Sequence, residues 1–200
     1  MSLNSHYNDL YKDQKPFGDT IHPFVEEVFS FLHSGSVLDI GAGQGRNSLP
    51  FARRGFRVSA IDISSEAMRQ LKEASEKEGL NIEIVTGDVG DIVLRKQYDL
   101  IICSFMLHHL GPRDGIALME RIKKHTNPKG FNIIMTFTTE GDFFRLNGPS
   151  RFYVKRGQLE EIYSDWKILQ YKEKTGRAFQ KNESGQNMQN LAAYLFAQKS

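Results

Sequence analysis

Along residues 19–137, short apolar runs alternate with longer amphipathic segments. Each apolar run is typical of a buried strand, and together they cover residues 37–40, 56–61, 82–86, 98–104 and 131–137. The amphipathic segments carry apolar residues three or four positions apart, which predicts helices over residues 19–33, 44–54, 64–78 and 113–125. Strands that alternate with helices in this way predict a mostly parallel sheet with helices on both faces.

Two of these helices carry further local signals. In the helix over 19–33, Phe24 and Phe31 fall on the same apolar side, so both are expected to be buried. Ser64 is placed to cap the helix that follows it, with Glu66 in the first turn, where a negative charge is favourable. These signals strengthen the prediction of two helices beside the sheet.

The pattern changes after residue 137. Residues 138–150 are expected to be irregular, and a short helix is expected near 158–163. Two strand-like runs over 166–175 and 187–197 flank a turn rich in asparagine, serine and glycine, which predicts an antiparallel hairpin. No repeat, linker or low-complexity segment divides the chain, so we predict an α/β fold in one domain. Its parts are an N-terminal arm and helix, a core and a closing segment, over residues 1–35, 36–137 and 138–200.

The most informative segment is Val-Leu-Asp-Ile-Gly-Ala-Gly-Gln-Gly at residues 37–45. Its three alternate glycines leave one face of the turn without side chains, so a ligand can approach the backbone. Asp39 adds a carboxylate at the carboxyl end of the strand, where open α/β sheets bind ligands. A phosphate would be met by N–H groups and a cation. The acid instead favours a ligand with positive charge, such as the amino and sulfonium groups of S-adenosylmethionine.

Two more acids follow the next strands of the predicted sheet. Asp62 ends the second strand, where an acid in a nucleotide-binding sheet accepts hydrogen bonds from ribose hydroxyls. The alternative is an ordinary turn aspartate before a helix. Asp88 follows the third strand, where the same geometry places an acceptor for the adenine amino group. A turn residue explains Asp88 equally well.

Other residues with candidate chemistry lie outside this loop. His108 follows the fourth strand and can accept a proton near neutral pH, but the preferred interpretation is that it lines the pocket without reacting. Tyr7 and Tyr11 share one face if their segment is helical, and aromatic faces suit a sulfonium cation. The alternative is that the two tyrosines pack the N-terminal arm. Cys103 lies inside an apolar run and is expected to fill the core.

Composition narrows the class of protein. The 26 basic and 24 acidic residues nearly balance, so no net field favours nucleic acid or a membrane surface. No apolar run approaches the roughly 18 residues of a membrane span, and the first residues lack the pattern of a secretory signal. One cysteine in the chain fits a reducing compartment. We expect a cytoplasmic enzyme, monomeric or homodimeric, without a metal site and without a nucleic-acid or membrane partner.

Several motifs together resemble class I S-adenosylmethionine-dependent methyltransferases. They are residues 37–45, Asp62, Gly87-Asp88-Val89, residues 98–103, Leu107-His108-His109-Leu110 and residues 127–131. The resemblance implies a Rossmann-like, seven-stranded, mostly parallel sheet with helices on both faces and a C-terminal antiparallel β-hairpin. It also implies S-adenosylmethionine as the cofactor and residues 36–137 as the cofactor-binding core.

A narrower resemblance, to the tellurite-resistance methyltransferases of the TehB type, extends over nearly the whole chain. It is carried by residues 43–48, 124–134 and 157–166. That family methylates chalcogen oxyanions such as tellurite and selenite in the bacterial cytoplasm. In the final hairpin the family carries a His-Arg pair and a further Arg, where this chain has Phe179, Gln180 and Asn187. Their loss removes charge-assisted hydrogen bonds to an anion.

The resemblance also implies a set of site residues. The cofactor is expected to contact Asp39, Gly41, Ala42, Gly43, Gly45, Arg46, Asn47, Asp62, Ile63, Asp88, Val89, Ser104, Phe105, Tyr7 and Tyr11. His108 is the candidate catalytic base, needed if the acceptor is a hydroxyl or a protonated amine. The wall of the acceptor pocket is expected from Met106, Phe143, Phe144 and Phe152.

We therefore expect an S-adenosylmethionine-dependent methyltransferase that acts on a small molecule. A chalcogen oxyanion is one candidate acceptor, and a thiol, amine or hydroxyl compound is the other. An NAD-dependent oxidoreductase is an alternative, but its fingerprint places the third glycine three positions after the second, whereas Gly45 follows Gly43 by two. The remaining alternative is a protein that binds S-adenosylmethionine without turnover.

Overall fold

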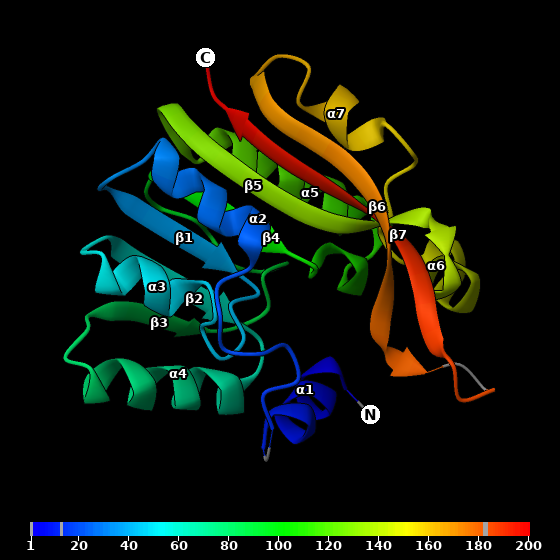
Figure 1. Cartoon of the computed structure of the whole chain (residues 1–200), viewed down its shortest axis with the longest axis horizontal. Helices are drawn as coiled ribbons and strands as arrows, with labels where there is room; N and C mark the ends of the chain where they lie inside the picture. Colours follow the sequence, from blue (N-terminus) through cyan, green and yellow to red (C-terminus); the bar gives the residue numbers. More distant parts are fainter. Residues whose placement is uncertain (1, 13, 182–183) are drawn as a thin grey trace. The chain divides into compact units, whose positions relative to one another are not determined.

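The computed structural model describes residues 2–12, 14–181 and 184–200, and its sheet has seven strands in the order β3-β2-β1-β4-β5-β7-β6 (Figure 1). The chain is divided into two compact units, Met1–Ile102 and Cys103–Ser200. The predicted single domain over residues 1–200 stays a prediction. The strand order and the closing hairpin agree with the predicted fold class.

The first unit contains parallel strands and the helices that connect them. β1 pairs in parallel with β2, and β2 pairs in parallel with β3. Its elements are α1 (Leu3–Tyr11), α2 (Pro23–Glu26), η1 (Glu27–Ser30), β1 (Ser36–Ile40), α3 (Ser48–Arg53), β2 (Arg57–Asp62), α4 (Ser65–Lys77), β3 (Ile82–Thr86) and most of β4 (Tyr98–Ser104). Four of the five residues of β1 are buried, as expected for a strand covered on both faces.

The predicted cap of α4 is confirmed. The Ser64 hydroxyl accepts a hydrogen bond from the Ala67 N–H at 3.1 Å, and Glu66 stands in the first turn. Met68 and Leu71 are buried at helical spacing on the side of α4 that faces the unit's core. Local sequence signals are sufficient here because cap, charge and apolar spacing all favour the same helix.

The helix predicted over 19–33 is shorter than expected. It begins at Pro23, and after Glu26 it continues only as the 3-10 turn η1. Proline has no N–H to donate, so it is favoured at a first helical position. The residue before it, His22, caps the helix by accepting a bond from Phe24 N–H at 3.2 Å.

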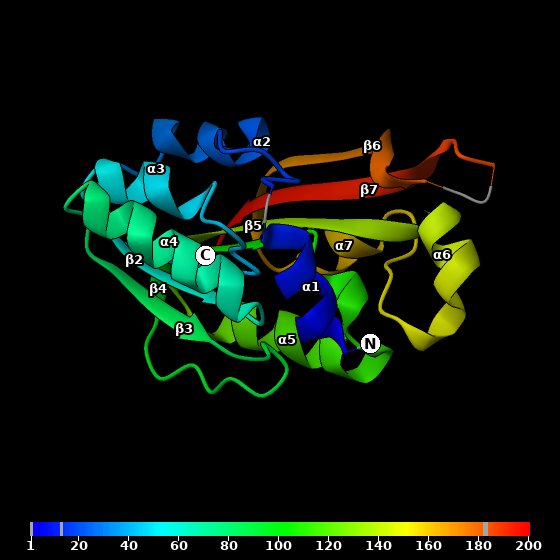
Figure 2. The same ribbon diagram turned by 90° about the horizontal axis from the view of Figure 1, so that it is seen from below.

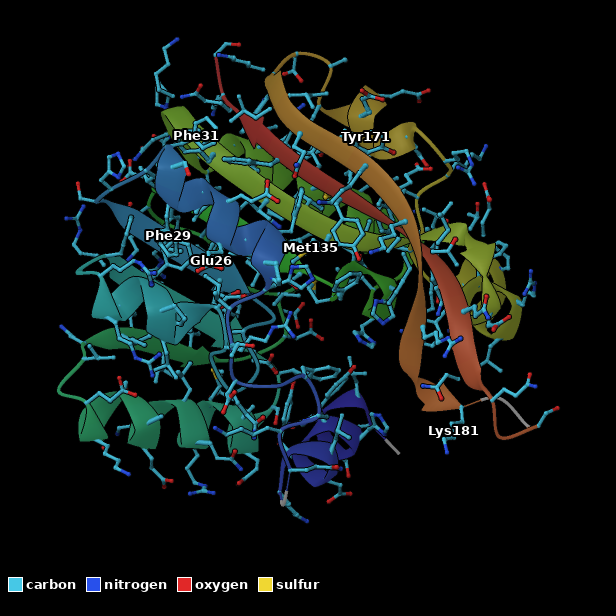
Figure 3. The ribbon with its side chains drawn as sticks, viewed as in Figure 1. Glu26, Phe29, Phe31, Met135, Tyr171 and Lys181 are labelled. Carbon is cyan, nitrogen blue, oxygen red and sulfur yellow. The ribbon has the colours of Figure 1, made fainter. Side chains whose placement is uncertain are left out.

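The change of helix type alters which aromatic rings are buried (Figure 3). The Phe29 ring packs 4.7 Å from the Phe51 ring, with the Arg54 guanidinium 4.0 Å from the Phe29 ring centre. Phe31 was expected on the buried side, but 52% of it is exposed, so that prediction is wrong. The backbone leaves helical geometry at this residue, which rotates its side chain away from Phe24 and Val28.

The second unit contains the antiparallel part of the sheet. β5 pairs with β7 and β7 pairs with β6, all antiparallel, which confirms the predicted hairpin (Figure 2). Its elements are η2 (Leu107–His109), α5 (Pro112–Lys124), β5 (Thr126–Gly141), α6 (Asp142–Asn147), η3 (Gly148–Ser150), α7 (Gln158–Ile162), β6 (Lys167–Lys181) and β7 (Asn187–Gln198).

The segment over 138–150 is ordered into secondary structure, so its predicted irregularity is wrong. β5 continues to Gly141 because β7 supplies hydrogen-bond partners along its edge. At Gly141 the backbone has a φ of +150°, and an added Cβ would lie 2.7 Å from the Cα of Asn190. Only glycine permits this close crossing. The helix α6 begins at the next residue and lies beside β7 (Figure 2).

Candidate functional site

The glycine-rich loop after β1 is held to the strand beside it. The N–H groups of Gly41 and Ala42 both donate to the carbonyl of Ile61, at 2.9 and 3.0 Å. Gly43 and Gly45 have φ values of +53° and +82°, in the left-handed region that favours glycine. This conformation delays the following helix, so α3 begins at Ser48 rather than near residue 44 as predicted.

Two of the glycines are also required by packing. A Cβ on Gly45 would lie 2.2 Å from Cδ1 of Leu71, and one on Gly43 would lie 2.7 Å from the hydroxyl oxygen of Tyr11. The bare backbone predicted for ligand approach is therefore closely covered by the protein's own side chains at these two positions. The loop is compact because residues of β2, α4 and α1 all contact it.

Asp39 is the most unusual group of this site. It is fully buried, and its Oδ2 accepts a hydrogen bond from the Ser48 hydroxyl at 2.6 Å. Its Oδ1 has no hydrogen-bond partner among the described residues. Burial, opposed in part by the Ser48 bond, raises the pKa of Asp39 to about 6. A buried carboxylate oxygen without a partner is suited to receive a donor or a positive charge from a ligand.

Asp62 braces the loop. Its Oδ2 accepts from Gly43 N–H at 2.8 Å and its Oδ1 accepts from Ser64 N–H at 2.9 Å. Burial raises the pKa of Asp62, while these backbone donors act in the opposite direction. A third backbone donor, Ile63, acts on the same carboxylate, which offers about four lone-pair sites. The predicted contact with ribose hydroxyls is compatible with the bracing and stays a prediction.

Tyr7 and Tyr11 lie on the helix α1, as their spacing suggested. Their ring centres are 5.9 Å apart. Burial raises the pKa of Tyr7 to about 12, with the negative charge of Asp62 as the second cause. The pKa of Tyr11 is raised by the same two causes. Both phenols therefore keep their protons at neutral pH and face the region of Asp62 as neutral hydrogen-bonding groups.

The helix α1 is fixed to α4 by polar contacts that the sequence did not indicate. Oδ1 of Asn8 accepts from the Ser64 hydroxyl at 2.8 Å and from Glu66 N–H at 3.1 Å. The side chain of Gln70 donates to the carbonyl of Tyr11 at 2.9 Å. An asparagine inside a helix has no local signature of such a role, because its partners are more than 50 residues away.

The next two predicted cofactor residues hold the segment that follows α1. Arg46 donates to the carbonyl of Phe17, and the buried Asn47 side chain accepts from His22 N–H at 3.2 Å. Burial lowers the pKa of Arg46, and the negative charge of Asp39 opposes this effect. Contacts of Arg46 and Asn47 with the cofactor stay predictions.

Residues after β2 and β3 complete the predicted cofactor set in this unit. Asp88 is exposed, and its Oδ1 accepts from Gly90 N–H at 2.8 Å, which is the turn role named as its alternative. Val89 is buried, and Ile63 is half-buried. A contact of Asp88 with adenine is not needed to explain its present geometry and stays a prediction.

In the second unit, the segment after β4 has an unusual backbone. Phe105 has a φ of +52°, a conformation that is uncommon for a bulky side chain. Its N–H donates to the carbonyl of Met135 at 2.7 Å, and its ring lies 5.0 Å from that of Phe137. Ser104 before it is half-buried and Met106 after it is buried. Backbone conformations of this kind are enriched at functional sites.

His108 lies in a group of aromatic side chains. Its ring centre is 4.9 Å from that of Phe137 and 5.8 Å from that of Phe143. Phe144 packs against the same group, which also contains the buried Tyr153. Burial lowers the pKa of His108 well below its ordinary value, so the imidazole is neutral at physiological pH.

The predicted wall residues do not all lie together. Phe143 and Phe144 belong to the aromatic group around His108. Phe152 instead packs against Gly115 of α5, where an added Cβ would lie 2.3 Å from its ring. The side chains of Phe179 and Gln180 lie outside the part of the chain that the structure describes. Asn187, at the start of β7, is exposed.

A family model described as "Tellurite resistance protein TehB" matches residues 3–195 of this chain. The chain belongs to the TehB family. A probable S-adenosyl-L-methionine-dependent methyltransferase TehB from Haemophilus influenzae is 30% identical over 189 residues, which is 94% of this chain and 66% of the relative. The chain thus spans just under two thirds of the length of this relative.

Solved structures agree with the family. The crystal structure of TehB from Haemophilus influenzae superposes with a TM-score of 0.81 at 29% identity, over 90% of this chain and 63% of the other. The N-methyltransferase NodS from Bradyrhizobium japonicum, in complex with S-adenosyl-L-homocysteine, gives a TM-score of 0.75 at 13% identity, over 98% and 97%. At that identity, NodS shows the fold alone. The predicted family and fold class are confirmed by these matches.

The described part of the chain contains neither a candidate metal-binding group nor a candidate membrane-spanning helix. It holds no group of three or more His, Cys, Asp or Glu side chains that could bind a metal ion. No helix within it is long and apolar enough to cross a membrane.

Proposed function

We propose that this chain transfers the methyl group of S-adenosylmethionine to a small-molecule acceptor. The observation that carries the proposal is Asp39, whose buried Oδ1 has no partner among the described residues. It lies near the end of β1, just before the glycine-rich loop, in a chain that matches the TehB family over residues 3–195. A carboxylate in this state is stabilised by a ligand that brings positive charge and N–H donors.

The residues of the first unit fit such a cofactor. S-adenosylmethionine would supply an electrophilic methyl group on a positively charged sulfur. Asp39 would accept from its amino group, and Asp62 would use its remaining lone pairs for the ribose hydroxyls. The neutral phenol of Tyr7 and the aromatic face of Tyr11 would provide surroundings that suit a cation without pairing with it.

The acceptor is the less determined half of the reaction. The family name points to tellurite, an oxyanion. One observation argues against tellurite as the acceptor. Where the family carries a His-Arg pair and a further Arg, this chain has Phe179, Gln180 and Asn187. Anion recognition depends strongly on charge-assisted hydrogen bonds. We therefore propose a thiol, amine or hydroxyl compound as the preferred acceptor, with a chalcogen oxyanion as the second candidate.

For such acceptors a base is useful. A thiol, a hydroxyl or a protonated amine must lose its proton before or during attack on the methyl carbon. His108 is neutral and half-buried among aromatic rings, so it keeps a lone pair available at physiological pH. An oxyanion would need no base.

Calorimetry with S-adenosylmethionine, S-adenosylhomocysteine and NAD tests the cofactor. We expect binding of both sulfur compounds and none of NAD, and Asp39→Asn should weaken the binding. Preference for NAD, or failure to bind either sulfur compound, would refute the methyltransferase. Exposed Asp91→Asn, outside the predicted cofactor set, is the matched control for removing a carboxylate.

Transfer of labelled methyl from S-adenosylmethionine tests the acceptor. The panel contains tellurite, selenite, and small thiols, amines and phenols. Turnover restricted to tellurite and selenite would show that the arginines of the hairpin are dispensable. Cofactor binding without methylation of any acceptor would favour a protein that holds S-adenosylmethionine without turnover.

The same proposal extends to the setting of the protein. We propose a cytoplasmic enzyme that acts as a monomer or homodimer, without nucleic acid or membrane partners, because its charges nearly balance. Light scattering after size exclusion gives the oligomeric state. A shift of labelled DNA or RNA at physiological salt would contradict the exclusion of nucleic acid.

A further inference from the structure

Asn190 of β7 carries a buried amide group that is only half used. It is 3% exposed, and its Oδ1 accepts from Phe143 N–H at 2.8 Å. That bond fixes the orientation of the amide, since only the oxygen can accept. Its Nδ2 has no partner among the described residues. A buried donor left without a partner destabilises the folded protein, so a ligand that accepts from it would remove this cost.

His108 presents a second unpaired polar atom near the same phenylalanine. Its Nδ1 is buried and has no hydrogen-bond partner in the described chain. The imidazole lies nearly parallel to the Phe143 ring, at 16° and 5.8 Å between centres. Asn190 thus holds the backbone of Phe143, while His108 stacks on its ring. The two side chains that carry the unused atoms come from β7 and η2, and both contact Phe143 of α6.

The surroundings of these atoms are aromatic. Phe143 lies edge-on to Phe137 at 4.8 Å between ring centres, and Tyr153 and Met188 are buried in the same group. Flat or apolar molecules are favoured by such rings. Two polar atoms within an aromatic group are typical of a small-molecule site, where a few polar contacts set the orientation.

Three arginines of this unit are engaged with other parts of the protein. Arg145 is paired with Asp142 at 2.6 Å, and Arg156 is paired with Glu140 at 2.7 Å. Arg151 donates to the carbonyl of His109 at 2.6 Å. An oxyanion would have to displace these contacts to gain one of these three cations as a partner. Arg177, exposed on β6 opposite Gln189, is the cation next to Asn190 that the oxyanion arm of the test also probes.

We propose that Asn190 Nδ2 and His108 Nδ1 are the polar contacts of the methyl acceptor, and that the acceptor is an uncharged aromatic thiol or hydroxyl compound. This inference rests on the proposed methyltransferase function and narrows its acceptor. Asn190 donates to an oxygen or sulfur of the acceptor and sets its orientation. The acceptor's ring packs on Phe143 and Phe137.

The step balances in atoms and electrons. The acceptor's O–H or S–H proton passes to the lone pair of His108, while its oxygen or sulfur forms a bond to the methyl carbon. The bond between that carbon and the sulfonium breaks, and its electron pair stays on the sulfur as S-adenosylhomocysteine. The imidazolium then returns its proton to water.

The test compares matched variants on named acceptors. Asn190→Asp keeps an oxygen for Phe143 N–H, removes the donor and adds a negative charge, and Gln189→Glu adds the same charge at the adjacent exposed position while leaving Asn190 intact. The acceptors are catechol, phenol and benzyl mercaptan, with tellurite and selenite as the anionic arm. Affinity for S-adenosylhomocysteine is measured for every variant.

The proposal expects wild type to methylate at least one of the three uncharged compounds in preference to the oxyanions. Asn190→Asp should lower kcat/KM for that compound about tenfold, with the affinity for S-adenosylhomocysteine unchanged. Gln189→Glu should leave both unchanged. His108→Gln should lower kcat about 10²–10⁴-fold, as expected for loss of a general base.

Any one of three results would overturn the proposed acceptor contacts. The first is a preference for tellurite or selenite, the second is no turnover of any of the three uncharged compounds, and the third is normal activity of Asn190→Asp. In each case, binding of S-adenosylhomocysteine by wild type would leave the proposed cofactor standing, and its absence would refute the methyltransferase itself. Calorimetric binding of catechol in the presence of S-adenosylhomocysteine supplies a readout without turnover, and Asn190→Asp must weaken it.

Discussion

Replacing Asp39 by asparagine should stabilise the protein without cofactor and weaken its binding of cofactor. Asp39 is fully buried, has one oxygen bonded to Ser48, and has no partner for the other oxygen among the described residues. Asparagine has nearly the same shape and keeps an oxygen for the Ser48 hydroxyl. The substitution therefore removes a buried negative charge with little change in packing.

The magnitude follows from the raised pKa. Burial moves the pKa of Asp39 from 3.8 to about 6 in the folded protein, which corresponds to a cost of about 3 kcal/mol when the group is fully ionised. Between these two pKa values the folded state binds the proton more tightly than the unfolded state. Stability therefore falls as the pH rises through this window, and the full cost is present above it.

Urea unfolding without cofactor checks this prediction at two pH values. From pH 5 to pH 8, the free energy of unfolding of wild type should fall by roughly 1–2 kcal/mol more than that of Asp39→Asn, because part of the cost is already present at pH 5. Comparing the two proteins cancels the titration of the other groups, since only Asp39 differs. At pH 8 the variant should be the more stable protein.

Cofactor binding should respond in the opposite direction. A cationic ligand favours the ionised carboxylate, so the affinity of wild type for S-adenosylhomocysteine should weaken as the pH falls below about 6. Asp39→Asn should bind more weakly at pH 8, by about 1–3 kcal/mol, and show less of this pH dependence. Two results would refute the role of Asp39 as a buried carboxylate that binds the cofactor. One is a free energy of unfolding that depends on pH in the same way in both proteins, and the other is unchanged affinity of Asp39→Asn for S-adenosylhomocysteine.

Two further predictions test the loop and the N-terminal helix. Gly45→Ala should lower the urea midpoint more than Gly55→Ala. Both glycines have φ near +80°, so the backbone cost is similar in the two variants. An added Cβ at Gly45 would collide with Leu71, whereas one at Gly55 would have no atom within 4 Å. The left-handed conformation alone costs about 1–2 kcal/mol for alanine, so equal midpoints would contradict the packing argument. Asn8→Ala should speed amide hydrogen exchange in residues 3–11, because it removes the acceptor for the Ser64 hydroxyl and for Glu66 N–H. Asn8→Asp retains the acceptor, so exchange in that variant should stay slow. Equally slow exchange in Asn8→Ala would show that α1 is held by other contacts.

The parts of the fold that were predicted well depend on local signals that agree with one another. The helix α4 has a serine cap, an acid in its first turn and regular apolar spacing, so its bounds match the prediction. The hairpin of β6 and β7 was predicted from two strand-like runs and a polar turn. In such segments each residue favours the same structure, and the tertiary context adds little.

Predictions failed where a distant partner decides the local structure. The stretch over 138–150 contains strand and helix because β7 pairs with the end of β5 and Asn190 binds Phe143 N–H. The residues of that stretch carry no strong propensity of their own. Phe31 is exposed because η1 is a 3-10 turn, which changes the angle between successive side chains.

Three features could be predicted from the sequence: the alternation of strands and helices, the position of the glycine-rich loop, and the acids at the ends of the strands beside that loop. These features are local, because periodicity, caps and glycine conformations depend on near neighbours. The tertiary structure alone decided which polar atoms find partners. Asp62 braces Gly43, Asn8 holds Ser64, and one oxygen of Asp39 is left unpaired. Hydrogen bonds between residues far apart in sequence leave no periodic trace, so the chemistry of the site becomes visible only when the chain is folded.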